Sequence, residues 1–100
     1  MASPQNKPHR TETLRISSAR LNTENCAAIS SQGHSLIESG ATELLVDVSE
    51  VTFVDSSGIG ALVGLRKKVG EHGSVVLLNP QPFVRKVLSL TKMTHLFEIR

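Results

Sequence analysis

Two short apolar runs, Leu44 to Val48 and Val75 to Leu78, restrict most strongly what this chain can fold into. Each run is too short and too continuously apolar for a surface helix, so each is predicted to be a strand covered on both faces. A helical pattern lies between the two runs, which favours a parallel crossover. The sequence therefore predicts an α/β fold with a mixed, mostly parallel sheet flanked by helices.

Three helices are expected around these strands. The first runs for about 17 residues from a cap at Asn22 or Thr23 to a C′ glycine at Gly40, because apolar and small residues recur at helical spacing between them. The second is predicted from about Gly58 to Glu71, and the third from Asn79 through about Lys92 with Pro82 in its first turn. Shorter strands are predicted at residues 14–16 and 96–99, and residues 51–54 lead directly into the second helix.

The chain has 100 residues, which is enough for one domain with one hydrophobic core. Residues 1–13 are polar and contain two prolines, so they are predicted to be a flexible tail, with the domain at 14–100. The single Cys26 excludes an intramolecular disulfide framework and favours a reducing compartment. No apolar run approaches the roughly 18 residues of a membrane span. A cytoplasmic protein without membrane insertion is expected.

The balance of charges argues against nucleic acid as a partner. Eleven basic and nine acidic residues give a net charge of +2, and the chain has three Phe but no Trp or Tyr. Nucleic-acid binding usually relies on a strong basic excess and on aromatic stacking platforms.

The segment Asp55-Ser56-Ser57-Gly58 is the most informative polar motif. A strand ends there in three small polar residues, and a glycine follows where a helix begins. The first N–H groups of a helix lack intrahelical acceptors and lie at the positive end of its dipole, so an anion or a phosphorylated serine is stabilised at such a turn. The alternative is that Ser56 or Ser57 only caps the helix.

The helix after the turn has more apolar surface than its core-facing side requires. Leu62, Leu65 and Val69 form one stripe with Gly58 and Ala61 that is sufficient to face the core. Ile59 and Val63 lie about 100° or more away, beside Arg66. An exposed apolar surface next to the serines suggests a docking surface for another protein; the alternative is that neighbouring elements cover it.

These motifs resemble a known family. The run from Leu44 to Ile99, with V-T-F-V-D-S-S-G-I-G at its centre and P-F-V-R-K-V-L-S-L-T-K-M-T-H-L-F-E-I downstream, is similar to a STAS domain of the bacterial anti-sigma factor antagonist type. The resemblance implies a protein that, when unphosphorylated, sequesters an anti-sigma factor that is also an ATP-dependent serine kinase, and so frees a sigma factor. It further implies that this kinase phosphorylates the antagonist and that a serine phosphatase resets it.

The resemblance also assigns roles to residues. It places the phosphoacceptor at Ser57, with Ser56 as the fallback and with Asp55 and Gly58 as neighbours that shape the turn. The partner-binding residues that it implies are Ile59, Gly60, Val63, Arg66 and Lys67. Ala19-Arg20-Leu21-Asn22 stands where such antagonists have a Gly-x-Leu-Asp-like turn.

Other functions fit the sequence less well. Gly58-Ile59-Gly60 with Gly64 fits a dinucleotide-binding glycine pattern, but Asn79 occupies the place where a ribose-binding carboxylate is needed. The four histidines show no metal-ligand spacing. No enzyme activity, cofactor or metal is therefore expected. The remaining alternative is a small cytoplasmic STAS adaptor subunit of a membrane transporter complex, without a phosphorylation cycle.

Overall fold

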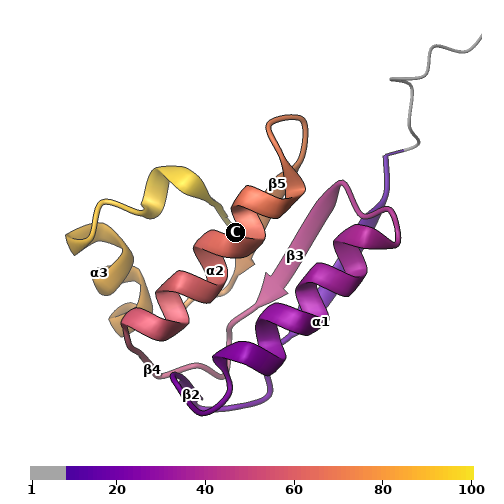
Figure 1. Ribbon diagram of the computed structural model, residues 1–100. Helices are drawn as coiled ribbons and strands as arrows, with labels where there is room; N and C mark the ends of the chain where they lie inside the picture. Colours follow the sequence, from indigo (N-terminus) through magenta and orange to yellow (C-terminus); the bar gives the residue numbers. More distant parts are fainter. Residues whose placement is uncertain (1–8) are drawn as a thin grey trace, which may run out of the picture.

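The computed structural model describes residues 9–100 as one α/β unit (Figure 1). The main sheet has the strand order β1-β3-β5-β6, and every strand pair in it is parallel. The elements in chain order are β1 Thr11–Arg15, β2 Arg20–Leu21, α1 Cys26–Glu38, β3 Glu43–Asp47, β4 Phe53–Val54, α2 Ser56–Val69, β5 Ser74–Leu78, α3 Pro82–Leu90, a 3₁₀ turn Thr94–Leu96 and β6 Glu98–Ile99. The predicted fold class, with a mostly parallel sheet flanked by helices, is confirmed.

The core lies between the sheet and the helices. Helices α1 and α2 run side by side over one face of the sheet, and α3 lies beyond α2 (Figure 1). Leu44 and Val46 of β3 point into this layer and are fully buried, together with Leu62 and Leu65 of α2 and Leu88 of α3. Burial of this many apolar side chains is the main term that stabilises such a domain.

The two apolar runs differ in how far they are covered. In β5, Val75, Val76 and Leu77 are all fully buried, as the pattern predicted. In β3, Leu45 points to the opposite face and is only half-buried, so the expectation of cover on both faces is wrong for this strand. On that face the neighbouring edge strand β1 presents Thr13 and Arg15, which are exposed.

Several predicted boundaries are corrected by hydrogen bonding. Strand β1 begins at Thr11, so residues 11–13 belong to the sheet rather than to a tail; residues 1–8 of the predicted tail lie outside the described part. Helix α1 begins at Cys26 and has 13 residues, with Asn25 at its N-cap position, so the prediction that Asn22 or Thr23 caps it is wrong. Asn22 instead accepts a hydrogen bond in the turn before the helix. Gly40 does follow the helix as its C′ glycine, with φ 118°.

Candidate functional site

The turn before α2 is built around Asp55. This residue is the N-cap, and its Oδ1 accepts a hydrogen bond from the backbone N–H of Gly58 at 3.0 Å. Its own carbonyl accepts from the N–H of Ile59 at 3.0 Å. Ser56 and Ser57 are therefore the first two residues of the helix, and the alternative that one of them is the cap is wrong. Their side chains remain available for other chemistry.

Strand β2, which sequence reasoning missed, fixes this turn in place. Its two residues pair in parallel with β4, with Leu21 opposite Val54. The carbonyl of Leu21 accepts a hydrogen bond from the N–H of Asp55 at 3.2 Å. A pair of only two residues has almost no sequence signature of its own, which explains why the pattern did not reveal it.

Gly58 is the point of closest approach between the turn and β2. A methyl group added there would lie 2.8 Å from Leu21 Cγ and from Val54 Cγ2, and it would also meet the Leu21 carbonyl oxygen. Only glycine allows the helix to start this close to the neighbouring strand. The predicted role of Gly58 in shaping the turn thus has a steric reason.

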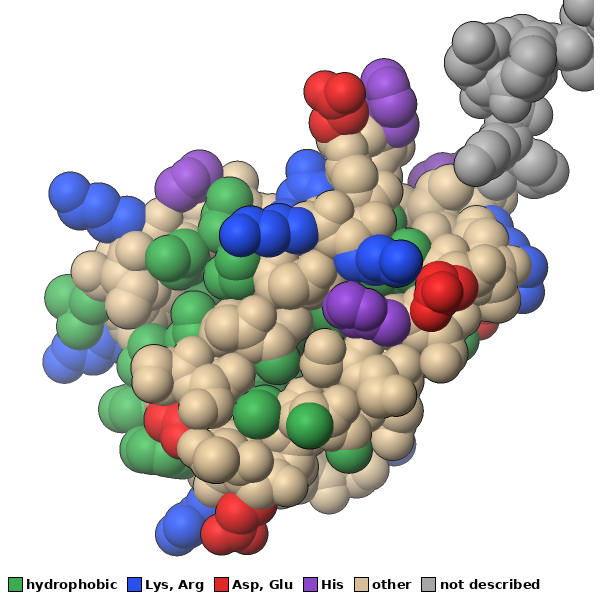
Figure 2. All heavy atoms as spheres, viewed as in Figure 1, with side chains coloured by type: hydrophobic (Ala, Val, Ile, Leu, Met, Phe, Trp, Pro, Cys, Tyr) green, Lys and Arg blue, Asp and Glu red, His purple; other side chains and the backbone are tan. Residues whose placement is uncertain are grey.

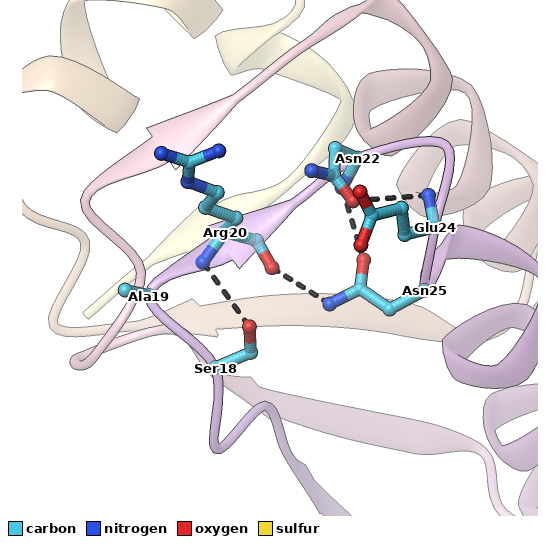
Figure 3. Close-up of a pocket in the computed structure, with 6 residues that line it drawn as sticks. All are labelled: Ser18, Ala19, Arg20, Asn22, Glu24 and Asn25. Carbon is cyan, nitrogen blue, oxygen red and sulfur yellow. Dashed lines mark hydrogen bonds between the residues drawn. The ribbon is translucent and has the colours of Figure 1, made fainter.

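The loop from Ser18 to Asn25 forms the second half of the site (Figure 3). The side chain of Asn25 donates to the Arg20 carbonyl at 2.7 Å and accepts from the N–H of Asn22 at 3.0 Å. Asn22 in turn accepts from the N–H of Glu24 at 3.0 Å. These bonds hold the loop around a shallow surface pocket of about 460 Å³ lined by Ser18, Ala19, Arg20, Asn22, Glu24 and Asn25.

Thr23, at the tip of this loop, touches the predicted phosphoacceptor. Its hydroxyl lies 3.1 Å from the Ser57 hydroxyl, although the two residues are 34 positions apart in the chain. Ser57 is half-buried, whereas Ser56 is exposed and has no such neighbour among the side-chain hydrogen bonds within residues 9–100. The structure thus adds Thr23 to the site, and no signal in the sequence could have paired it with Ser57.

The outer face of α2 is only partly as predicted. Ile59 is 8% exposed and belongs to the core cluster that also contains Val84 and Leu88 of α3, so the expectation that it lies on an exposed surface is wrong. The alternative that neighbouring elements cover this side chain is therefore correct for Ile59, and the helical wheel of α2 alone does not reveal that cover. Val63 is half-buried and packs against the same core cluster.

The remaining predicted docking residues lie at the surface. Gly60 and Lys67 are exposed, and Arg66 is half-buried and donates through Nη1 to the Gly70 carbonyl at 2.8 Å. A side chain added at Gly60 or Gly64 would meet no atom within 4 Å. Two glycines therefore leave a flat area on α2 that the fold itself does not require. We call Gly60, Val63, Arg66 and Lys67 the docking face.

Within residues 9–100, no group of three or more His, Cys, Asp or Glu side chains has a geometry suited to a metal ion. In the same part of the chain, no helix has the length and apolar character needed to cross a membrane.

The profile of the STAS domain family matches residues 5–100. This match spans nearly the whole chain, and the protein therefore belongs to the STAS domain family. The fold is that of anti-sigma factor antagonists: the unphosphorylated form of the antagonist SpoIIAA superposes with a TM-score of 0.77 at 24% identity, over 92% of this chain and 81% of SpoIIAA.

Two curated relatives match part of the sequence. A STAS-domain containing protein of Pseudomonas aeruginosa is 39% identical over 56 residues, which are 55% of this chain and 55% of the relative. An anti-sigma F factor antagonist of Lysinibacillus sphaericus is 32% identical over 57 residues, 56% of this chain and 49% of the relative. The chain thus spans about half the length of the curated relatives it matches.

Proposed function

We propose that this protein is an anti-sigma factor antagonist whose binding is switched by phosphorylation of Ser57. In this proposal the unphosphorylated protein sequesters an anti-sigma factor that is also a serine kinase, and so frees a sigma factor. A serine phosphatase restores the binding form. The role is that of a binding protein without catalytic residues of its own, acting in the cytoplasm.

The placement of Ser57 is the observation that carries the proposal. Its hydroxyl is at the start of α2, half-buried, and oriented by the Thr23 hydroxyl at 3.1 Å. The preceding Asp55 occupies the cap position, which leaves Ser57 free to accept a phosphoryl group from the partner's ATP. A phosphoserine adds a charge of about −1.5 to −2 at pH 7. That charge changes what can dock against the turn and the docking face.

Mass spectrometry after incubation with ATP tests the proposal. Each anti-sigma factor kinase of the host is purified and incubated in turn with the wild-type protein, Ser57→Ala and Ser56→Ala. Phosphate is expected on Ser57 in the wild type and in Ser56→Ala, and it should be lost in Ser57→Ala. Phosphate on Ser56 alone would move the acceptor to the neighbouring serine, and no phosphate on either would remove the switch.

Affinity measurements separate the switch from simple docking. Ser57→Asp is expected to weaken binding to the kinase, whereas Ser57→Ala should bind normally and resist inactivation by ATP. Equal affinity of Ser57→Asp and wild type would instead support a docking module without phosphorylation, such as a transporter adaptor.

A further inference from the structure

Helix α3 carries a second apolar line that is more exposed than its core-facing line. Val84 and Leu88 point inward and are buried. Phe83, Val87 and Leu90 follow one another at positions i, i+4 and i+7, which places them on a different line of the same helix. Phe83 is 44% exposed, Leu90 is 73% exposed, and Val87 is half-buried. A helix that only completes the core needs one apolar line, so the exposed part of this second line is available to a partner.

Neighbouring elements extend this line into a larger apolar area. The ring of Phe53, from β4, stacks on Phe83 with centroids 5.8 Å apart, and it is also 44% exposed. Figure 2 shows hydrophobic side chains gathered over the region between α2 and α3, with several Lys and Arg side chains around it and one acidic side chain at its lower edge. We call this area the α2–α3 strip; its members are Phe53, Val63, Phe83, Val87 and Leu90.

Helices α2 and α3, with the segment 91–96 that follows α3, are unusually basic for this chain. The protein as a whole carries a net charge of +2, but α2, α3 and residues 91–96 contain no Asp or Glu at all. Six basic residues lie on them: Arg66, Lys67, Lys68, Arg85, Lys86 and Lys92. The ion pairs found within residues 9–100 all involve other basic residues: His9, Arg10, Arg15 and Arg100.

We propose that the α2–α3 strip binds an acidic, apolar segment of the anti-sigma factor. This inference rests on the proposed function and adds the chemistry of the contact. Apolar side chains of the segment cover Phe83, Val87 and Leu90, while its carboxylates meet the uncompensated basic side chains around them. Aromatic residues and Arg are typical of such interfaces, and complementary charge gives specificity and faster association.

The geometry favours a protein segment over an anionic membrane surface. Only Leu90 exposes most of its side chain; Phe53 and Phe83 cover part of each other, and Val63 and Val87 are half-buried. A bilayer surface needs apolar side chains that protrude together, whereas a helical or extended segment fills an uneven apolar strip.

An acidic occupant also accounts for the direction of the proposed switch. Val63 follows Ser57 by six residues in α2, which corresponds to about 9 Å along the helix axis. This separation is comparable to the Debye length of about 8 Å at physiological ionic strength. A phosphate on Ser57 therefore repels carboxylates bound at the strip, and binding ends.

Charge reversal at two adjacent residues of α3 tests the inference. Lys86 and Arg85 are both exposed. At 100° per residue, Lys86 lies about 60° from Phe83 and borders the strip, while Arg85 lies nearly opposite. Lys86→Glu is expected to weaken binding to the anti-sigma factor about tenfold, and Arg85→Glu by less than about twofold. Leu90→Gln should also weaken binding about tenfold, and Ser89→Gln serves as its control. Because residues 85, 86, 89 and 90 are all exposed, the four variants should fold, which circular dichroism checks.

The outcomes separate the two proposals. If an anti-sigma factor binds the wild type and phosphorylates Ser57 but binds Lys86→Glu and Leu90→Gln equally well, the inference about the strip is wrong and the proposed function stands. If none binds the wild type, the proposed function fails and the inference with it. Restoration of Lys86→Glu binding by an acidic-to-Lys change in the partner would support direct contact. Cosedimentation with phosphatidylserine-containing vesicles that is lost in Lys86→Glu, alongside unchanged protein binding, would assign the strip to a membrane and overturn the proposal.

Discussion

The hydroxyl groups of Thr23 and Ser57 lie 3.1 Å apart, and this contact joins the loop before α1 to the first turn of α2. The hydrogen bond restricts the rotamer of Ser57 and so presents its oxygen in one direction. The loop that carries Thr23 is itself held by Asn22 and Asn25. The proposed phosphoacceptor is thus oriented from outside its own helix.

Removal of the Thr23 hydroxyl should therefore slow phosphorylation of Ser57. We expect a several-fold lower rate for Thr23→Val and a nearly normal rate for Thr23→Ser, which keeps the hydroxyl. Stability should fall by at most about 1 kcal/mol, because the lost bond is at the surface. Quantitative mass spectrometry of Ser57 and urea denaturation measure the two effects. Equal phosphorylation rates in all three proteins would show that the contact has no orienting role.

Substitution of Gly58 by alanine should destabilise the domain. The added methyl group lies 2.8 Å from Leu21 Cγ and Val54 Cγ2 and meets a backbone carbonyl that cannot move freely. Such overpacking costs about 3 kcal/mol. Urea denaturation of Gly58→Ala against wild type checks this value, and an unchanged midpoint would mean that β2 shifts more easily than its pairing with β4 implies.

The same substitution in the next turns of the helix should have the opposite sign. At Gly60 and Gly64 an added methyl group meets nothing within 4 Å, so alanine only removes the helix-interior cost of glycine. Gly60→Ala and Gly64→Ala should each stabilise the protein by about 0.5 to 1 kcal/mol. If these glycines allow close approach of a partner, both variants will bind it more weakly despite their higher melting temperatures; stronger binding would argue against that use.

Ile59 and Val63 should respond differently to aspartate. Ile59 is 8% exposed within the core cluster, so Ile59→Asp is expected to unfold the domain by burying an unpaired charge. Val63 is only half-buried, so Val63→Asp should remain folded and lose partner binding. Circular dichroism and affinity measurements distinguish the two, and a folded Val63→Asp with normal affinity would place the interface elsewhere.

Acid should weaken the turn after β3. The backbone N–H of Ser49 donates to Asp47 Oδ1 at 3.0 Å and holds the pKa of that carboxyl below its ordinary value. Because the folded-state pKa is lowered, the stabilisation is present above the ordinary pKa of about 3.9 and is lost as pH falls through the folded-state value. Asp47→Asn has no carboxylate at this position and lacks this stabilisation at every pH. The wild type loses it on acidification, so its advantage in stability over Asp47→Asn should shrink as the pH falls from about 5 to about 2. Thermal melts across that range measure it, and a constant difference would exclude this contribution.

Much of the architecture followed from the amino-acid sequence alone. The apolar runs at β3 and β5, the helical spacing between them, Gly40 after α1 and Pro82 at the start of α3 placed the main elements within a few residues. The same interpretation placed Ser57 at the turn directly before a helix, and the structure moves the helix start two residues earlier, to Ser56. These features depend on local preferences and on the periodicity of a single segment, both of which are present in the sequence.

Only the tertiary structure decided which surfaces of those elements are covered and which distant residues meet. The helical wheel of α2 separated Ile59 from the main apolar stripe, but the tertiary structure buries it in the common core cluster. Thr23 and Ser57 are brought together by the pairing of β2 with β4, across 34 residues. The physical reason is that periodicity describes the faces of one element, whereas burial and long-range hydrogen bonds depend on the element packed against it.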